Sequence, residues 1–235
     1  MTLEERENDL FERWKKTLGD TDGVFAKDGV ANEERFNSAK YKVLFLAKET
    51  NNTNKNWDTR DYLKNGVFYK RNGKPIIATF SNIFRWSNLF LNHLTDYKEF
   101  KKVPKNKDAR VEIFSQIGMM NLKKTAGTHT TNIYELKAFI KDDSPYINEQ
   151  INLYKPDIII CCGKGVYSGF KVAMGEIVEE NTINGKFKTS KFIGVDFETI
   201  LIDFFHPQAR VKVSEQYELL RSIKEQYHLW INKGK

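Results

Sequence analysis

Cysteine and histidine are scarce in this 235-residue chain, and their placement excludes several kinds of site. The two cysteines, Cys161 and Cys162, are neighbours inside an apolar run, where successive side chains point to opposite faces, so no disulfide joins them. No other cysteine is available for a cysteine-based zinc site. The four histidines are dispersed without metal-binding spacing. We therefore expect a protein of a reducing compartment, the cytoplasm, with no metal.

The sequence also lacks long hydrophobic runs. No segment reaches the roughly 20 apolar residues of a membrane span. The N-terminus is acidic and amphipathic, unlike a signal peptide, so we expect no membrane association. Charge is unbalanced instead: 38 Lys and Arg residues face 31 Asp and Glu residues, for a formal net charge of +7. The excess favours a polyanionic partner, although a solvated basic surface is the simpler explanation.

Short apolar runs predict the strands of a central sheet. They lie at 41–47, 118–122, 157–162 and 201–205. Helical or long connections separate them, which predicts a three-layer α/β/α fold around a mostly parallel, four-stranded sheet. Asn184-Gly185 predicts a hairpin turn.

Apolar residues at helical spacing predict the flanking helices. These are expected over 3–18, with Thr2 and Glu5 as a capping box, and over 79–94, 145–154, 165–174 and 214–230. The basic stretch 97–110 is expected to be a solvated loop, with a phosphate-contacting flank as the alternative. We expect a single domain over 1–235, made of an N-terminal helical extension (1–35), a core (41–210) and a C-terminal helix (214–230).

Three of the predicted strands end in an unusual polar residue: Glu49, Asn121 and His206. In a parallel sheet these ends share one edge, so the three side chains are expected to meet. Each alone has an ordinary explanation, as a structural acid, a turn residue and a strand stop. Together they suggest chemistry. A carboxylate can activate water, an amide can read a base edge, and a histidine can stabilise a leaving anion. This combination suits a pocket that cleaves the glycosidic bond of an extruded pyrimidine.

These motifs, in this order, resemble the uracil-DNA glycosylase superfamily over roughly residues 41–210. The family's first motif begins with glycine and has Asp or Asn third and Pro fourth; the segment 47–50, Ala-Lys-Glu-Thr, occupies its place, with Glu49 at the water-activating position. Asn121 matches the base-reading Asn, and His206-Pro207-Gln208 matches the His-Pro-Ser motif. Alanine, threonine and glutamine therefore replace the family's glycine, proline and serine.

The resemblance implies a monofunctional glycosylase that uses no metal or other cofactor. The family's iron–sulfur branches need four cysteines, twice the number here. Glu49 would activate water, His206 would hydrogen-bond the pyrimidine O2, and Asn121 would select the base. Further base-binding residues would be Phe80 (with Phe84 as the runner-up), Lys48, Thr50 and Asn51. DNA contacts would come from Lys123, Lys124, Lys164, Gln208 and Arg210.

The expected partner is DNA, duplex or single-stranded, bound by a monomer. The altered first motif leaves room for a modified base, such as one in phage DNA in a defence setting rather than in repair. Two other functions stay open. One is a nucleic-acid-binding protein that kept the fold without the chemistry. The other is a small-molecule nucleotide hydrolase, which the basic surface and the missing phosphate loop disfavour.

Overall fold

The computed structural model describes residues 1–18, 25–50, 57–66, 70–71, 74–75, 78–92, 94–127 and 132–231. The helices are α1 (Leu3–Thr17), α2 (Glu33–Ser38), α3 (Thr59–Lys64), α4 (Ala78–Leu91), α5 (Tyr97–Lys102), α6 (Lys107–Phe114), α7 (Ile133–Asp142), α8 (Ser144–Tyr154), α9 (Val166–Met174) and α10 (Val213–Ile231). The strands are β1 (Gly29–Val30), β2 (Val43–Ala47), β3 (Lys70–Arg71), β4 (Lys74–Pro75), β5 (Ile117–Asn121), β6 (Ile158–Cys162), β7 (Val178–Ile183), β8 (Phe187–Ile193) and β9 (Glu198–Phe204).

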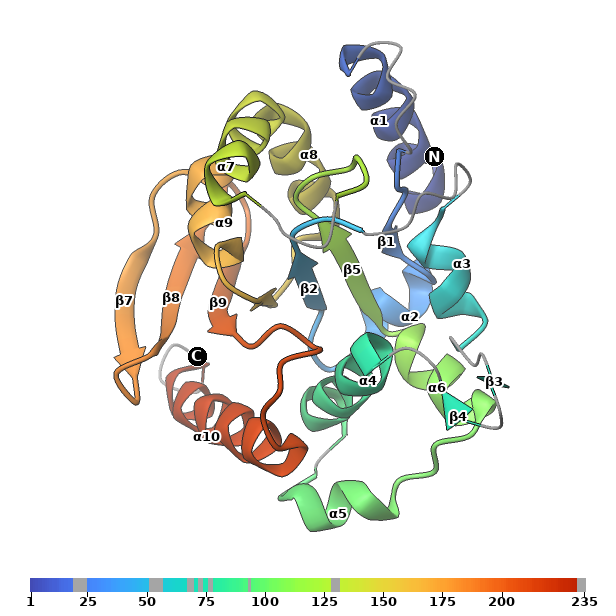
Figure 1. Cartoon of the computed structure of the whole chain (residues 1–235), viewed down its shortest axis with the longest axis vertical. Coiled ribbons are helices and arrows are strands. Elements are labelled where there is room, and N and C mark those ends of the chain that lie inside the picture. The colour runs from blue at the N-terminus through green and yellow to red at the C-terminus, as the bar shows by residue number, and fades with distance from the viewer. Residues whose placement is uncertain are drawn as a thin grey trace.

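The main sheet of the described chain has seven strands in the order β1-β5-β2-β6-β9-β8-β7. β2 pairs in parallel with β5 and β6, and β6 pairs in parallel with β9. The other three pairings, β1 with β5, β8 with β9 and β7 with β8, are antiparallel. Because β5, β2, β6 and β9 run in one direction, their carboxyl ends lie at the same edge of the sheet (Figure 1).

The α/β class predicted from the sequence is confirmed, but the expected four-stranded sheet is wrong. Three further strands make the sheet mixed, and they lack the apolar runs that mark a buried strand. β1 is only two residues long, and β7 is an edge strand whose sole buried residue is Ile183. The hairpin turn at Asn184-Gly185 is confirmed: both residues have positive φ, 50° and 64°, and they join β7 to β8.

Apolar side chains pack on both faces of the sheet, which explains the unbroken apolar sequences of β2 and β6. Phe45 stacks on Trp86 of α4 with ring centroids 6.4 Å apart, while its neighbour Leu44 points to the opposite cluster. The first face is covered by α4, α5, α6 and α10, and the second by α1, α2, α7, α8 and α9 (Figure 1). α1 is joined to α8 by Trp14, which stacks on Tyr146 at 5.5 Å.

The predicted helices are present with small shifts at their ends. α1 has the expected capping box, in which the Thr2 hydroxyl accepts from the Glu5 amide and the Glu5 carboxylate accepts from the Thr2 amide. The stretch 97–110 is not a loop, because Asp96 and Asn106 cap α5 and α6 within it. The predicted N-terminal extension, 1–35, supplies β1 to the main sheet. None of the helices described here is both long and apolar enough to cross a membrane.

Candidate active site

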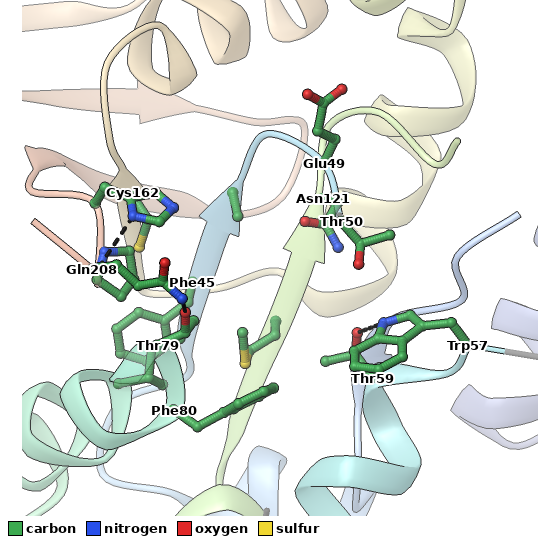
Figure 2. A pocket seen from close by; sticks show the side chains of 15 residues that line it. Phe45, Glu49, Thr50, Trp57, Thr59, Thr79, Phe80, Asn121, Cys162 and Gln208 are labelled. Carbon is green, nitrogen blue, oxygen red and sulfur yellow. Dashed lines mark hydrogen bonds between the residues drawn. The ribbon is translucent and has the colours of Figure 1, made fainter. Parts of the chain in front are cut away.

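A cavity of about 480 Å³ lies at the carboxyl ends of the parallel strands (Figure 2). It forms where loops leave β2, β5, β6 and β9, so residues far apart in the sequence share its walls. Six residues predicted from the sequence line this one cavity: Glu49, Thr50, Phe80, Asn121, His206 and Gln208. Its size is within the usual range of small-ligand pockets.

His206 follows β9 and is held by the loop after β6. The Gly163 amide donates to the Phe204 carbonyl at 2.9 Å. A Cβ at Gly163 would lie 3.1 Å from the His206 Cβ, a tight contact, and the φ of +101° at Gly163 would strain any other residue. The Gln208 amide donates to His206 Nδ1 at 3.1 Å. A neutral imidazole in this arrangement carries its proton on Nε2.

The electrostatic surroundings of His206 favour that neutral form. Loss of hydration lowers the pKa of the imidazole, and the positive charge of Lys48 lowers it further. The His206 side chain is still partly exposed, so its desolvation is incomplete. The ring therefore offers an Nε2–H donor, with little positive charge, at neutral pH.

Asn121 is the last residue of β5, and Asp28 fixes it from the neighbouring edge of the sheet. The Asn121 amide and its side-chain Nδ2 both donate to Asp28 Oδ2, at 2.8 and 3.2 Å. Within the described part of the chain, no donor reaches the Asn121 Oδ1. The side chain thus presents an acceptor and one remaining N–H at the cavity.

Glu49 lies at the end of the cavity with its carboxylate turned away from Asn121 and Thr50 (Figure 2). Its Oε2 accepts from Lys123 Nζ at 3.0 Å, and its side chain is only 5% exposed. The carboxylate packs so closely on Gly127 that a Cβ there would lie 2.1 Å from the Glu49 Cδ. Glu49 therefore ties the loop after β2 to the loop after β5 in this conformation.

Aromatic rings form the other walls. Phe80 is 4% exposed and packs edge-on against Phe114 at 6.2 Å, so most of its surface belongs to the core. The alternative, Phe84, does not line the cavity. The sequence analysis missed Trp57, which lines the cavity, stacks on Tyr62 at 4.1 Å and donates to Thr59. Its only signal was a lone tryptophan in a long polar segment.

The remaining residues that were predicted to bind the DNA backbone or the base differ in exposure. Lys164 and Arg210 are exposed, as is Gln208, whose side-chain amide donates to the Thr79 hydroxyl at 2.9 Å. Lys123 is engaged with Glu49 and lies over the Phe139 ring at 4.8 Å. Lys48 is half-buried near His206. Asn51 lies outside the described residues.

The structure corrects the expectation that Lys124 contacts DNA phosphates. The residue is 1% exposed, and its Nζ lies 2.6 Å from Asp28 Oδ1. Desolvation lowers the pKa of this ammonium, and Asp28 opposes the shift. Lys124 points inward because the chain turns after β5. The sequence does not reveal which of the two adjacent lysines, Lys123 or Lys124, is buried.

The described residues contain no group of three or more His, Cys, Asp or Glu side chains that could hold a metal ion. Cys162 lines the cavity as a buried thiol whose pKa is raised by desolvation. Glu49, Asn121 and His206 line the same cavity. In comparisons with known proteins, the chain matches no family model and no curated protein.

Proposed function

We propose that this chain is a DNA glycosylase with a three-layer, uracil-DNA glycosylase-like fold. Its substrate would be a flipped uracil-like or modified pyrimidine, cut from its sugar by hydrolysis. One observation carries the proposal: Asn121, His206 and Phe80 line the same cavity of about 480 Å³. An amide, an imidazole and an aromatic ring are suited to read, polarise and stack an extruded base.

In the proposed reaction, His206 stabilises the departing base. As the C1′–N1 bond breaks, its electrons leave with the pyrimidine and negative charge builds at O2. The His206 Nε2–H is free to donate to O2 because Nδ1 already accepts from the Gln208 amide. The lowered pKa of His206 favours this neutral donor at physiological pH.

Glu49 is the proposed water-activating residue. The water oxygen would add to C1′ while its proton passes to the carboxylate, which would also stabilise the positive charge on the sugar. In the structure the Glu49 carboxylate is paired with Lys123 and turned from Asn121 (Figure 2). Catalysis would therefore require rotation of this side chain toward the cavity when DNA binds.

The same orientation of Glu49 favours a second function, that of a nucleic-acid-binding protein without hydrolysis. The carboxylate would then serve only to join the two loops through Lys123 and Gly127. Base release by the unaltered chain separates the two proposals, because the second excludes it, and Glu49→Gln then tests the role of Glu49. Base release is abolished and DNA binding nearly unchanged if Glu49 activates water. Unchanged release would remove Glu49 from the mechanism.

DNA is the proposed partner, bound by a monomer in the cytoplasm without a cofactor, in repair or in defence against phage. Lys164, Gln208 and Arg210 are exposed and would contact the backbone beside the cavity. Such contacts release counterions, so binding should weaken steeply with salt. A flat salt response would favour a small-molecule substrate.

The decisive experiment is incubation with duplexes and single strands that carry different modified pyrimidines, scored for abasic sites. The proposal predicts abasic sites with at least one pyrimidine. A parallel preparation of His206→Ala controls for a contaminating glycosylase, whose activity the substitution would not change. Binding to every substrate without any base release would support the non-catalytic alternative.

A further inference from the structure

Asp28 is a fully buried carboxylate directly before β1, and each of its oxygens has two hydrogen-bond donors. Oδ2 accepts from the Asn121 amide at 2.8 Å and from Asn121 Nδ2 at 3.2 Å. Oδ1 accepts from Lys124 Nζ at 2.6 Å and from Gln150 Nε2 at 2.9 Å. Asp28 thus joins a buried cation to the side chain that faces the cavity.

This contact determines which way the Asn121 amide faces. A carboxylate paired with an ammonium group has no hydrogen to donate, so it attracts Nδ2 and repels Oδ1. Asp28 lies on the β1 side of β5, whereas His206 follows β9 on the other side. Oδ1 must then face toward the β9 side. Figure 2 agrees, since the Asn121 oxygen lies toward Cys162 and its nitrogen toward Thr59.

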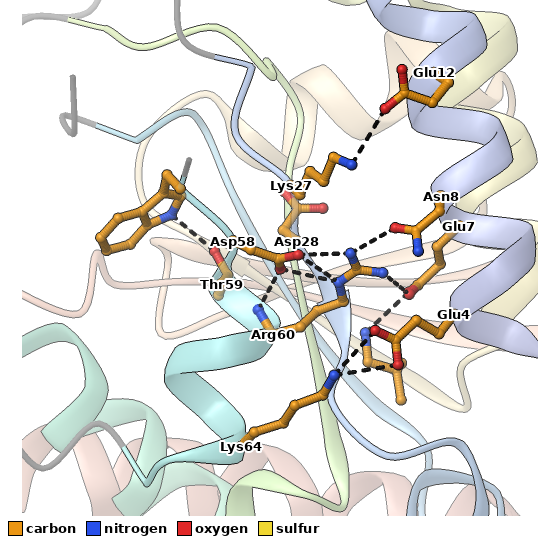
Figure 3. A network of polar contacts seen from close by, with 12 residues as sticks. Glu4, Glu7, Asn8, Glu12, Lys27, Asp28, Asp58, Thr59, Arg60 and Lys64 are labelled. Carbon is orange, nitrogen blue, oxygen red and sulfur yellow. Dashed lines mark hydrogen bonds and ion pairs between the residues drawn. The ribbon is translucent and has the colours of Figure 1, made fainter. Parts of the chain in front are cut away.

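The position of Asp28 is itself fixed by polar groups behind it. Gln150 also donates to the Tyr154 hydroxyl at 2.7 Å, and this hydroxyl donates to Glu7 at 2.6 Å. Arg60 donates to the other Glu7 oxygen at 2.8 Å. Figure 3 shows Asp28 beside the cluster of Glu7, Asp58 and Arg60 between α1 and α3. Lys124 and Gln150 share Oδ1 of Asp28, so loss of Gln150 alone leaves Lys124 on Oδ1 and both Asn121 contacts on Oδ2.

We propose that Asp28 is a positioning residue that locks the Asn121 amide with Oδ1 toward His206, and so makes the cavity select bases with N–H at N3 and oxygen at C4. The inference rests on the proposed function. With O2 at His206, the next ring position, N3, meets Oδ1, and the C4 substituent meets Nδ2–H. A base with an amino group at C4, such as cytosine, would instead place its N3 lone pair against the acceptor Oδ1 and its amino group against the donor Nδ2–H.

The test compares excision of uracil and of cytosine from otherwise identical duplexes. Asp28→Asn alone would leave the Lys124 ammonium buried without a counterion, and the variant could fail to fold. The double variant Asp28→Leu/Lys124→Met removes both charges and also the acceptor that holds Asn121 Nδ2. Methionine suits the site, where the Lys124 Nζ lies over the rings of Phe11 and Trp14 at 5.6 and 5.0 Å. Leucine is close to aspartate in shape and has no polar atom, so nothing at position 28 then fixes the orientation of the Asn121 amide.

We expect the preference for uracil over cytosine to fall at least about tenfold in the double variant, the scale of one bidentate base contact. Gln150→Met is the matched control, because it removes a donor from Oδ1 of Asp28 and leaves the Oδ2 contacts to Asn121 in place. The control should lower thermal stability and keep the preference. An unchanged preference in a folded double variant would overturn the inference.

A second measurement is independent of catalysis. In ¹⁵N NMR, the Asn121 side-chain amide, assigned by its loss in Asn121→Asp, should show one proton protected from exchange in the wild-type chain. Protection should disappear in the double variant and persist in Gln150→Met. Rapid exchange of both protons in the wild-type chain would overturn the role of Asp28. If no substrate is cleaved but this protection is found, the proposed function fails and the positioning by Asp28 stands.

Discussion

Arg60 gives the sharpest test of how the polar groups between α1 and α3 stabilise the chain. Its guanidinium is 3% exposed and donates to Glu7, Asp58 and Asn8. Arg60→Met keeps most of the aliphatic stem and removes the guanidinium, whose central carbon lies 5.5 Å from the centroid of the Phe11 ring. Glu7, whose side chain has no exposed surface, loses its cationic partner.

The expected loss is about 3–5 kcal/mol of unfolding free energy, because removal of one member of a buried pair leaves an uncompensated charge. A second pair joins the same two helices at the surface and is the matched control. Lys64 and Glu4 lie 3.2 Å apart with side chains 38% and 55% exposed. Lys64→Met should cost at most about 1 kcal/mol, because water screens this pair.

The loss in Arg60→Met should also depend on pH. Burial already raises the pKa of Glu7, and Arg60 partly opposes that shift. Without Arg60, the pKa of Glu7 in the folded chain rises further above its unfolded value. The penalty is full at pH values above the folded pKa, where Glu7 is ionised, and diminishes as the pH falls and Glu7 takes up a proton.

Urea unfolding of both variants at pH 8 and pH 5, followed by circular dichroism, measures these effects. Arg60→Met should lose several times more stability than Lys64→Met at pH 8, and the gap should narrow at pH 5. Equal, small losses of unfolding free energy in the two variants would refute the reasoning, because burial would then not change how much an ion pair contributes to stability.

Three further predictions concern the site and the sheet. His206→Ala should slow base release about 10²-fold, and wild-type release should decline toward acid below pH 6.5 because the pKa of His206 is lowered; a two-fold loss would exclude this role. Gly163→Ala should slow base release, because the new methyl group contacts His206. Gly185 also has positive φ but no neighbour within 4 Å, so Gly185→Ala should lower stability alone. Equal rates of base release in the two variants would contradict the role of the Gly163 contact. Burial raises the pKa of Asp203 to about 6, so the ionised carboxylate destabilises the folded chain. Asp203→Asn should therefore increase the unfolding free energy at pH 8, by up to about 3 kcal/mol, and leave it unchanged at pH 4.

The sequence predicts an element of the fold best where a single requirement, such as burial on both faces, determines its residues. β2 and β6 are buried on both faces, so their apolar runs were visible. β2, β5 and β9 run in one direction, and their carboxyl ends bring Glu49, Asn121 and His206 to one cavity. β7 is an exposed edge strand and needs no apolar run, so no such signal existed. The hairpin turn before β8 was recognisable because Asn184-Gly185 tolerates positive φ.

The orientation of individual side chains was beyond the reach of sequence. Lys123 and Lys124 are adjacent and chemically alike, yet the first pairs with Glu49 at the loop and the second is buried against Asp28. Asp28 gave no signal because its partners Asn121 and Gln150 lie 93 and 122 positions away. Such contacts depend on how the layers pack, which no local pattern encodes.

A crystal structure of Glu49→Gln bound to a uracil-containing duplex would test the central claim most directly, because the variant should bind without cleaving. We predict an extruded uracil in the cavity beside Phe80, with O2 within hydrogen-bonding distance of His206 Nε2 and N3 facing Asn121 Oδ1. A uracil that stays stacked in the duplex, with the cavity away from the bound DNA, would contradict the account.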